Sequence, residues 1–458
     1  MSLRGEGEIL LVSTYELGHA PHGIALPAAF LARAGYAPAA LDLSVEPLDE
    51  ARVRRARLVA ISVPMHTALR LGLEAAARVR ALRPDARIAF HGLYAPLNAG
   101  LLLRRGADAV LGGECEEELV ELAGAIERGE DLARFVRRAP GDVRPRRLDF
   151  PVPDRSGLPP PSRYARLVDA EGRERLAGYA EASRGCLHLC RHCPIPALYR
   201  GRFLAVPADV VLEDVARQVA AGATHVTFGD PDFLNGPGHA LRIARALHAR
   251  FPDVTFDFTA KVEHLVRDPS LLASLSGAGA LFVTSAVESL SDLVLARLAK
   301  GHVRADVERA FEACRAAGLA LRPTLVPFTP WETLDGYLEL VETFEARGWV
   351  GQLDPVQLSL RLLVPPGSLL EGDPDLRLAG LDEAGLSWRW RHPDPRMDAL
   401  QGRVAAAVED GAARGEDPAA TVGRVKVLAL AAAGRAHVHV SRPFASARAP
   451  RLTESWFC

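Results

Sequence analysis

Residues 183–196 read SRGCLHLCRHCPIP and contain three of the six cysteines of the chain. Cys186, Cys190 and Cys193 follow the spacing CxxxCxxC. A loop of this length can hold three corners of one iron–sulfur cube and leave the fourth iron without a protein ligand. The stretch therefore predicts a 4Fe-4S cluster with one iron open to a small molecule.

A structural zinc site is the alternative interpretation, with His188 or His192 as the fourth ligand. Zinc sites usually pair two CxxC-like halves across a longer loop, whereas this triplet is compact. The spacing therefore favours the cluster. Cys115 and Cys314 lie in amphipathic helical patterns, so we expect them in the core.

Outward from the triplet, βα units repeat on both sides, which predicts an α/β fold. From residue 178 to 372 the pattern fits a partial (β/α)6 barrel of the TIM type, in which reactive groups lie at the carboxyl ends of strands. Its six strand candidates are AGYAEAS, THVTFGD, VTFDFTA, ALFVTSAVE, LALRPTLVPF and PVQLSLRLLV.

Three further segments complete the predicted organisation. Residues 1–135 alternate short β-branched runs with amphipathic helices, which predicts a Rossmann or flavodoxin-like domain. Residues 136–177 are rich in Pro and Arg and are interpreted as a linker. Residues 373–458 form a small, mainly helical C-terminal region. The five strands expected in the first domain are EILLVS, APAALDL, RLVAISV, ARIAFH and GADAVLGG.

The composition indicates a globular protein with no bias toward charged partners. A net charge of −2, 48% hydrophobic and 24% charged residues predict binding neither to nucleic acid nor to membranes. We find neither a leader peptide nor a membrane span, and we expect a cytoplasmic protein. Only Lys261, Lys300 and Lys426 are lysines among 55 basic residues, which we interpret as codon bias.

Residues 178–366 resemble the radical S-adenosylmethionine (SAM) superfamily through the motif CxxxCxxC. The resemblance implies a 4Fe-4S cluster whose open iron binds SAM. His192 stands where the family usually has an aromatic residue, and its ring would pack against adenine.

Two further segments match the family. GDPDFLN resembles its glycine-rich motif, so Gly229 would let the backbone approach SAM and Asp230 would accept from its amino group; a plain tight turn is the alternative. FVTSAVES resembles its fourth strand, so Glu288 and Ser289 would contact SAM. Glu288 could instead pair with Arg322, which could also hold a carboxylate of SAM or substrate.

The first domain resembles the cobalamin-binding domain of one radical SAM class, over Ile9 to Ile126. The segments ISVPMHTALRLG and GADAVLGGECEEELVELA carry this resemblance. The histidine-ligand signature DxHxxG is absent, since the matching loop reads TYELGHAPHG, and only Gly92 follows the fourth strand. Cobalamin is thus one of two open outcomes; the other is a domain that keeps the fold without the cofactor.

The C-terminal segments LRLLVPPGS, RWRHPDPRMDALQ and LTESWFC resemble the CUAEP/CCAEP-tail radical SAM family, in which U is selenocysteine. In that family the cysteine matching Cys458 is followed by selenocysteine or cysteine and then Ala-Glu-Pro. We therefore expect that gene reading stopped at a UGA codon after Cys458, and that Cys458 is catalytic in the complete tail.

The predicted function is reductive cleavage of SAM for radical modification of a small molecule or group transfer to it, which includes carbon–heteroatom bond formation. The partners are a small-molecule substrate and a low-potential electron donor such as flavodoxin or ferredoxin. The alternative is a cobalamin or redox sensing module that does not cleave SAM.

Overall fold

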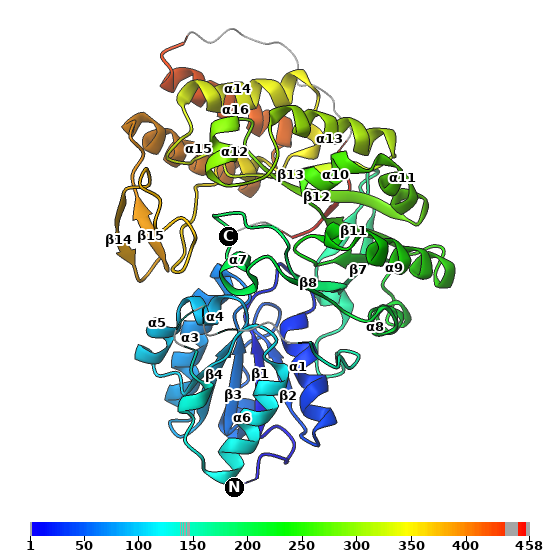
Figure 1. Ribbon diagram of the computed structural model, residues 1–458, viewed down its shortest axis with the longest axis vertical. Helices are drawn as coiled ribbons and strands as arrows, with labels where there is room; N and C mark the ends of the chain where they lie inside the picture. Colours follow the sequence, from blue (N-terminus) through cyan, green and yellow to red (C-terminus); the bar gives the residue numbers. More distant parts are fainter. Residues whose placement is uncertain are drawn as a thin grey trace.

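Three parts make up the chain in the computed structural model, which describes residues 2–137, 139, 141, 143, 147–435 and 448–454. An α/β domain at the N-terminus is followed by a curled sheet with outer helices and by a mainly helical region (Figure 1). The curled sheet and the C-terminal region lie beside each other at one end of the N-terminal domain (Figure 1). The C-terminal region contacts that domain directly, since His66 Nε2 lies 2.7 Å from Gly385 O.

The N-terminal domain is a five-stranded parallel sheet in the order β2-β1-β3-β4-β5, as expected. Residues of the strands alternate between two cores, so both faces are covered by helices. Helices α1 and α6 cover one face, and α2 to α5 cover the other. The elements are β1 Ile9–Ser13, α1 His22–Arg33, β2 Ala39–Asp42, α2 Glu50–Arg55, β3 Leu58–Ser62, α3 His66–Leu82, β4 Arg87–His91, α4 Tyr94–Leu97, α5 Ala99–Arg104, β5 Ala109–Val110 and α6 Glu116–Arg128.

The expected linker contains secondary structure. Strand β6 (Arg166–Val168) pairs antiparallel with β7 (Glu174–Ala180) and extends the second sheet. Leu148 and Phe150 pack in the same core as Leu26 and Phe30 of α1, so this segment joins the two sheets. The boundaries at 135, 177 and 372 remain predictions.

The second sheet is a half-barrel. It has seven strands in the order β13-β12-β11-β10-β7-β6-β16, of which β7 and β10 to β13 run parallel. The remaining elements are β8 Ser183–Gly185, α7 Ile195–Tyr199, β9 Phe203–Ala205, α8 Ala208–Ala220, β10 His225–Phe228, η4 Phe233–Asn235, α9 Pro237–Arg250, β11 Thr255–Thr259, α10 Val262–Arg267, α11 Pro269–Gly277, β12 Ala280–Glu288, α12 Asp292–Arg297, α13 Arg304–Ala316, β13 Ala320–Leu325 and α14 Leu334–Ala346.

The prediction of a sixth barrel strand at PVQLSLRLLV was wrong. Pro355 has no N–H to donate to a ladder and instead opens the 3-10 helix η6 (Pro355–Leu358), which Asp354 caps through Val356 N. One isolated bridge, Phe328 to Arg361, stands where the strand was expected. The barrel therefore has five parallel strands.

The C-terminal region returns to the half-barrel. It contains a hairpin, β14 (Leu378–Asp382) and β15 (Ser387–Trp390), and the helices α15 (Pro395–Ala413) and α16 (Pro418–Ala432). Strand β16 (Arg451–Leu452) then pairs with β6, and Ala449 N donates to Gly351 O at 3.0 Å. The last described residues thus bridge two edges of the curled sheet.

Within the described part of the chain, no helix combines the length and apolarity needed to span a membrane.

Candidate cluster and SAM site

The three cysteines of the triplet lie in one loop between β8 and α7, and all three are free thiols. Cys186 and Cys190 are buried, and Cys193 is partly exposed. Burial raises the pKa of Cys186, and it raises that of Cys193 to about 12. The other described cysteines, Cys115 and Cys314, lie in hydrophobic cores, as expected. The donor set therefore fits a cluster held by three thiolates.

Two residues of the loop after β10 hold the cysteine loop in place. Asp230 accepts from Ala182 N at 2.9 Å and from Ser183 Oγ at 2.5 Å. Asn235 Oδ1 accepts from Leu187 N at 3.2 Å and lies 3.9 Å from the Cys186 sulfur. Each carboxylate oxygen of Asp230 thus already has a donor in the protein. The geometry supports a positioning role for Asp230, and a contact with SAM stays a prediction.

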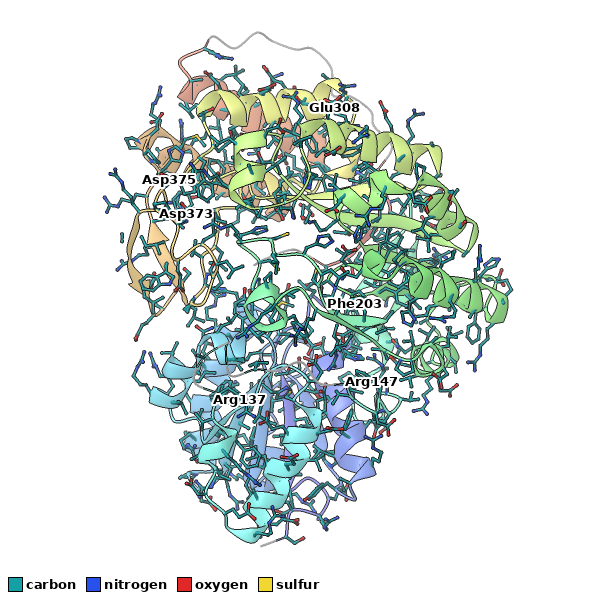
Figure 2. The ribbon with its side chains drawn as sticks, in the orientation of Figure 1. Arg137, Arg147, Phe203, Glu308, Asp373 and Asp375 are labelled. Carbon is teal, nitrogen blue, oxygen red and sulfur yellow. The ribbon has the colours of Figure 1, made fainter. Side chains whose placement is uncertain are left out.

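The far side of the loop is tied to the C-terminal region. Arg191 donates to the Asp373 carboxylate at 2.6 Å, and the Asp373 side chain is 1% exposed. Figure 2 shows Asp373 close to Asp375 in the C-terminal region. Ser368 Oγ donates to Arg191 O at 3.2 Å. The loop is therefore fixed from two directions, which is what preorganised metal ligands require.

Glu288 ends β12 with a backbone φ of 65° next to a register shift. A non-glycine residue in this region is strained, and such strain concentrates at functional sites. Its Oε1 accepts from Lys300 Nζ and lies 3.1 Å from His192 Nε2. Burial alone would raise the pKa of Glu288, but the charges of Lys300 and His192 lower it to about 2. Glu288 is therefore ionised, and its partner is Lys300, not Arg322.

His192 and Ser289 flank this carboxylate. The Nδ1 atom of His192 is buried without a hydrogen-bond partner, and the residue lines a large cavity. Ser289 Oγ donates to Glu332 at 3.0 Å and accepts from Ser291 N at 2.9 Å. His192 thus has a free ring atom for a ligand, whereas Ser289 is engaged within the protein.

Gly229 is required for close packing. A Cβ atom there would lie 1.9 Å from the hydroxyl oxygen of Tyr179, which no side chain could tolerate. Tyr179 in turn stacks on His19 of the N-terminal domain, with 4.8 Å between ring centroids. The glycine therefore makes room for an interdomain contact, and its predicted approach to SAM stays a prediction.

Arg322 lies on β13 and lines a cavity of about 1320 Å³. Its guanidinium donates one long hydrogen bond, 3.5 Å from Nη1 to Pro450 O. Burial lowers the pKa of Arg322. The same cavity is lined by His66 and Arg70 of the N-terminal domain and by Arg451 of β16, so all three parts of the chain surround it.

The loop after β1, which aligns with the missing histidine signature, is folded onto the half-barrel. His22 Nε2 lies 3.5 Å from the Glu181 carboxylate, and His19 stacks on Tyr179. Glu16 accepts from Gly23 N at 3.1 Å. His19 and His22 thus contact the half-barrel, and the absence of a cobalt ligand from this loop stays a prediction.

Sequence reasoning missed Lys300, Lys261 and Asn235. Lys300 is 2% exposed and Lys261 is 8% exposed, and both lie at the cluster end of the half-barrel. The signal was present, because a chain that uses Arg almost throughout keeps Lys at these positions. Codon bias explains the abundance of Arg but does not explain which lysines are kept. Cys458 lies outside the described residues.

Comparison with known proteins agrees with this site. Residues 181–341 match the model of the Radical SAM superfamily. The ribosomal protein uS12 methylthiotransferase RimO of Desulfosudis oleivorans is 27% identical over 204 residues, which are 41% of this chain and 45% of that protein. The chain thus spans less than half the length of this curated relative.

Solved structures share the fold. TsrM, a radical SAM methyltransferase from Kitasatospora setae with cobalamin and a [4Fe-4S] cluster bound, has a TM-score of 0.59 at 20% identity, over 76% of this chain and 70% of that one. The cobalamin-dependent SAM radical enzyme OxsB with aqua-cobalamin has a TM-score of 0.65 at 14% identity, over 88% and 67%. The CUAEP/CCAEP-tail assignment is finer than these matches and stays a prediction.

The cysteine triplet at one end of a parallel half-barrel lies within the matched residues 181–341, and this part of the chain is a radical SAM domain.

Proposed function

We propose that this protein is an enzyme that binds a 4Fe-4S cluster through Cys186, Cys190 and Cys193 and cleaves SAM reductively to modify a small molecule or transfer a group to it. With SAM on its open iron, such a cluster supplies a 5′-deoxyadenosyl radical. The observation that carries the proposal is the set of three free thiols in a loop fixed by Asp230 and Arg191.

Lys300 supports this assignment through its charge. Its buried ammonium interacts electrostatically with Cys190 and Cys193 as well as with Glu288. Three thiolates and a carboxylate in one buried region would repel each other, and a buried cation offsets this repulsion. In the proposed enzyme, Lys300 stabilises the ionised ligand set, and Glu288 and His192 face SAM.

The cavity supports a small anionic or zwitterionic substrate. Among the described residues, the partly buried cavity arginines Arg322 and Arg451 form no ion pair, whereas Arg361 pairs with Asp398 and Arg448 with Asp417. A partly buried guanidinium without a counter-ion binds carboxylate or phosphate well. A SAM or substrate carboxylate would occupy this place.

An electron donor such as flavodoxin or ferredoxin belongs to the proposal, as does a cytoplasmic location. Leu187 is 44% exposed and Leu189 is 54% exposed, and both lie between cluster ligands in the sequence. Exposed apolar side chains next to the cluster would let a donor protein approach it closely.

The experiment is anaerobic reconstitution followed by reduction with dithionite in the presence of SAM. We expect about four irons per chain and formation of 5′-deoxyadenosine by the wild type. The variant in which all three cysteines are replaced by Ala should give neither. Wild-type protein that holds the cluster but never cleaves SAM would support the sensing module instead.

Cobalamin binding is the second part of the proposal, and two observations favour it. The cavity is large and extends to His66, Arg70 and Tyr94 of the N-terminal domain. At the ends of β1 and β4, Ser13 Oγ and His91 Nε2 are buried without hydrogen-bond partners, which a ligand at this sheet edge could satisfy. Protein made with hydroxocobalamin should keep the coloured cofactor through gel filtration; colourless protein that cleaves SAM would show that the domain acts without it.

A further inference from the structure

Three side chains beside the cysteine loop converge although they come from different elements. His188 belongs to the loop itself, Asp232 follows β10, and His264 lies on α10, which follows β11. One ligand atom from each lies within 4.8 Å of the others. Asp232 is fully buried, and His264 is 8% exposed.

The distances within this triad suit a single metal ion. One metal ion takes a single nitrogen from each ring, and Asp232 Oδ2 lies 3.1 Å from His264 Nδ1 and 3.5 Å from His188 Nε2. The 3.3 Å contact between the two histidines involves the other nitrogen of His264, Nε2, which a metal on Nδ1 would leave free. Ligands about 2.1 Å from a tetrahedral metal are separated from each other by roughly 3.4 Å. Small rotations of the rings would therefore complete the site.

The Asp232 carboxylate is the independent sign that a ligand is missing. Its Oδ1 accepts from Leu234 N at 3.0 Å and lies 3.2 Å from His264 Nδ1, which fixes the orientation of the group. Its Oδ2, which faces both histidines, is buried and accepts no well-aligned hydrogen bond, although His264 Nδ1 lies 3.1 Å away. An unsatisfied buried carboxylate oxygen is costly, and a cation between the three residues would remove that cost.

The surroundings are compatible with a divalent cation. Glu263 Oε2 lies 3.8 Å from His188 Nδ1, where a carboxylate can orient a metal-binding imidazole. Lys261, the nearby cation, lies 3.7 Å from the same Glu263 carboxylate, so the charges of this pair offset each other. The negative charge of Asp232 is then left for the metal.

We propose that His188, Asp232 and His264 bind a divalent transition-metal ion, Zn²⁺ or Fe²⁺, beside the cysteine loop. Two imidazoles and one carboxylate are ligands that these ions prefer, and three protein ligands leave a coordination position open. A water molecule or a donor atom of a small molecule would fill that position. The site is separate from the three thiolates, so it does not depend on the proposed cleavage of SAM.

The test measures metal content and does not use activity. The full chain with Cys186, Cys190 and Cys193 replaced by Ala is titrated with Zn²⁺ against a chromophoric chelator, and we expect one bound equivalent. His264→Ala and Asp232→Asn in this background should lose that equivalent, with affinity at least tenfold lower. His239→Ala is the matched control, because His239 is a partly buried barrel histidine that bonds a backbone carbonyl, Ala182 O, at 3.2 Å.

A second measurement is used if the variant without the three cysteines folds poorly. Reconstituted wild-type protein should then contain five metal ions per chain by mass spectrometry, and His264→Ala should contain four. No extra equivalent in either preparation would overturn the proposal, as would an equivalent that survives both triad substitutions. Loss of SAM binding in Asp232→Asn without any bound metal would also overturn it, because the triad would then be part of the SAM pocket.

Discussion

Two loops that each follow a strand, the cysteine loop after β8 and the loop after β1, use chemically active residues in opposite ways. The cysteine loop of the half-barrel keeps three free thiols, and beside it His192 Nδ1 and Asp232 Oδ2 lack hydrogen-bond partners. The loop after β1 also carries a carboxylate and imidazoles, but Glu16 binds Gly23 N and His22 faces Glu181. Buried polar groups therefore serve different purposes in the two loops. In the cysteine loop they remain available to ligands, whereas in the loop after β1 they pack within the protein.

The difference comes from what surrounds each loop. The cysteine loop is fixed from behind by Asp230 and Asp373, so its ligand atoms stay free. The loop after β1 is packed directly against Tyr179 of the half-barrel. Residue type alone does not show which of these applies. Substitutions in the two loops should therefore have different consequences.

Cys190→Ala should have the largest effect. Loss of one of three thiolates leaves too few ligands for the cluster, so 5′-deoxyadenosine formation should fall to background. Cys115→Ala is the control in the N-terminal domain, because Cys115 is a buried core thiol whose pKa burial raises. Cluster content and product formation should be unchanged in this control. Formation of 5′-deoxyadenosine by Cys190→Ala would show that the cysteine loop, like the loop after β1, is not needed to hold the cluster.

Glu288→Gln should weaken SAM binding at least tenfold and leave the iron content unchanged. The substitution removes a carboxylate that is ionised throughout the assay range, since the pKa of Glu288 is about 2. It also leaves the buried Lys300 ammonium without its carboxylate partner. Calorimetric titration of reconstituted protein with SAM measures the effect. Glu16→Gln should bind SAM like the wild type. Equal affinities in all three proteins would make Glu288 a purely structural residue.

Asp230→Asn should destabilise the protein with a smaller effect on the cluster. The amide can accept from Ala182 N or from Ser183 Oγ but turns a donor toward the other, which costs roughly 1–3 kcal/mol of the free energy of unfolding. Urea unfolding at pH 8 measures this loss. Asp268→Asn, at an exposed helix cap of the same half-barrel, should be as stable as the wild type, because Asn and Asp are equally good N-caps. An Asp230→Asn variant as stable as the wild type would show that Asp230 does not position the loop.

Much of the fold could be predicted from the sequence. The five N-terminal strands and five of the six barrel strands follow from hydrophobic runs, since a strand covered on both faces must be apolar. The sixth failed because the pattern of PVQLSLRLLV resembles a strand, whereas Pro355 favours the first turn of a helix. Strand β16, two residues long and distant in sequence from its partner, carries no such pattern.

The candidate site was predicted less completely. The three thiols and Glu288 lie in recognisable sequence motifs, so the sequence alone identified them as site residues. The partners of Glu288 do not, because Lys300 reaches it from 12 residues further along the chain and only the folded turn brings them together. Asp230 and Asp232 are two residues apart and chemically identical, yet their hydrogen bonds separate a positioning role from a free oxygen. Local sequence does not encode that distinction.

Glu16→Gln should have the smallest effect, a change in how stability depends on pH. Burial raises the pKa of Glu16 from 4.5 to about 8, and nearby Glu181 and Asp42 add to the shift. Between these two values the folded protein binds more protons than the unfolded chain, so stability falls as pH rises through this window. His19 and His22, whose pKa values burial lowers to about 4 and about 3, act in the opposite direction, mainly below pH 6.5 and equally in the wild type and in Glu16→Gln.

The window from pH 6.5 to 8 therefore isolates the buried carboxyl groups. There the wild type should lose up to about 1.4 kcal/mol per pH unit through Glu16. Asp230 and Glu454, whose pKa values burial raises to about 7, add to the loss near pH 7 in every variant. Glu16→Gln keeps an oxygen that accepts from Gly23 N and removes the titrating proton, so its curve of unfolding free energy against pH should be flatter. The control Glu6→Gln, at an exposed position, should follow the wild type. Parallel curves for Glu16→Gln and the wild type would mean that the loop after β1 is open to water, and the contrast with the cysteine loop would then disappear.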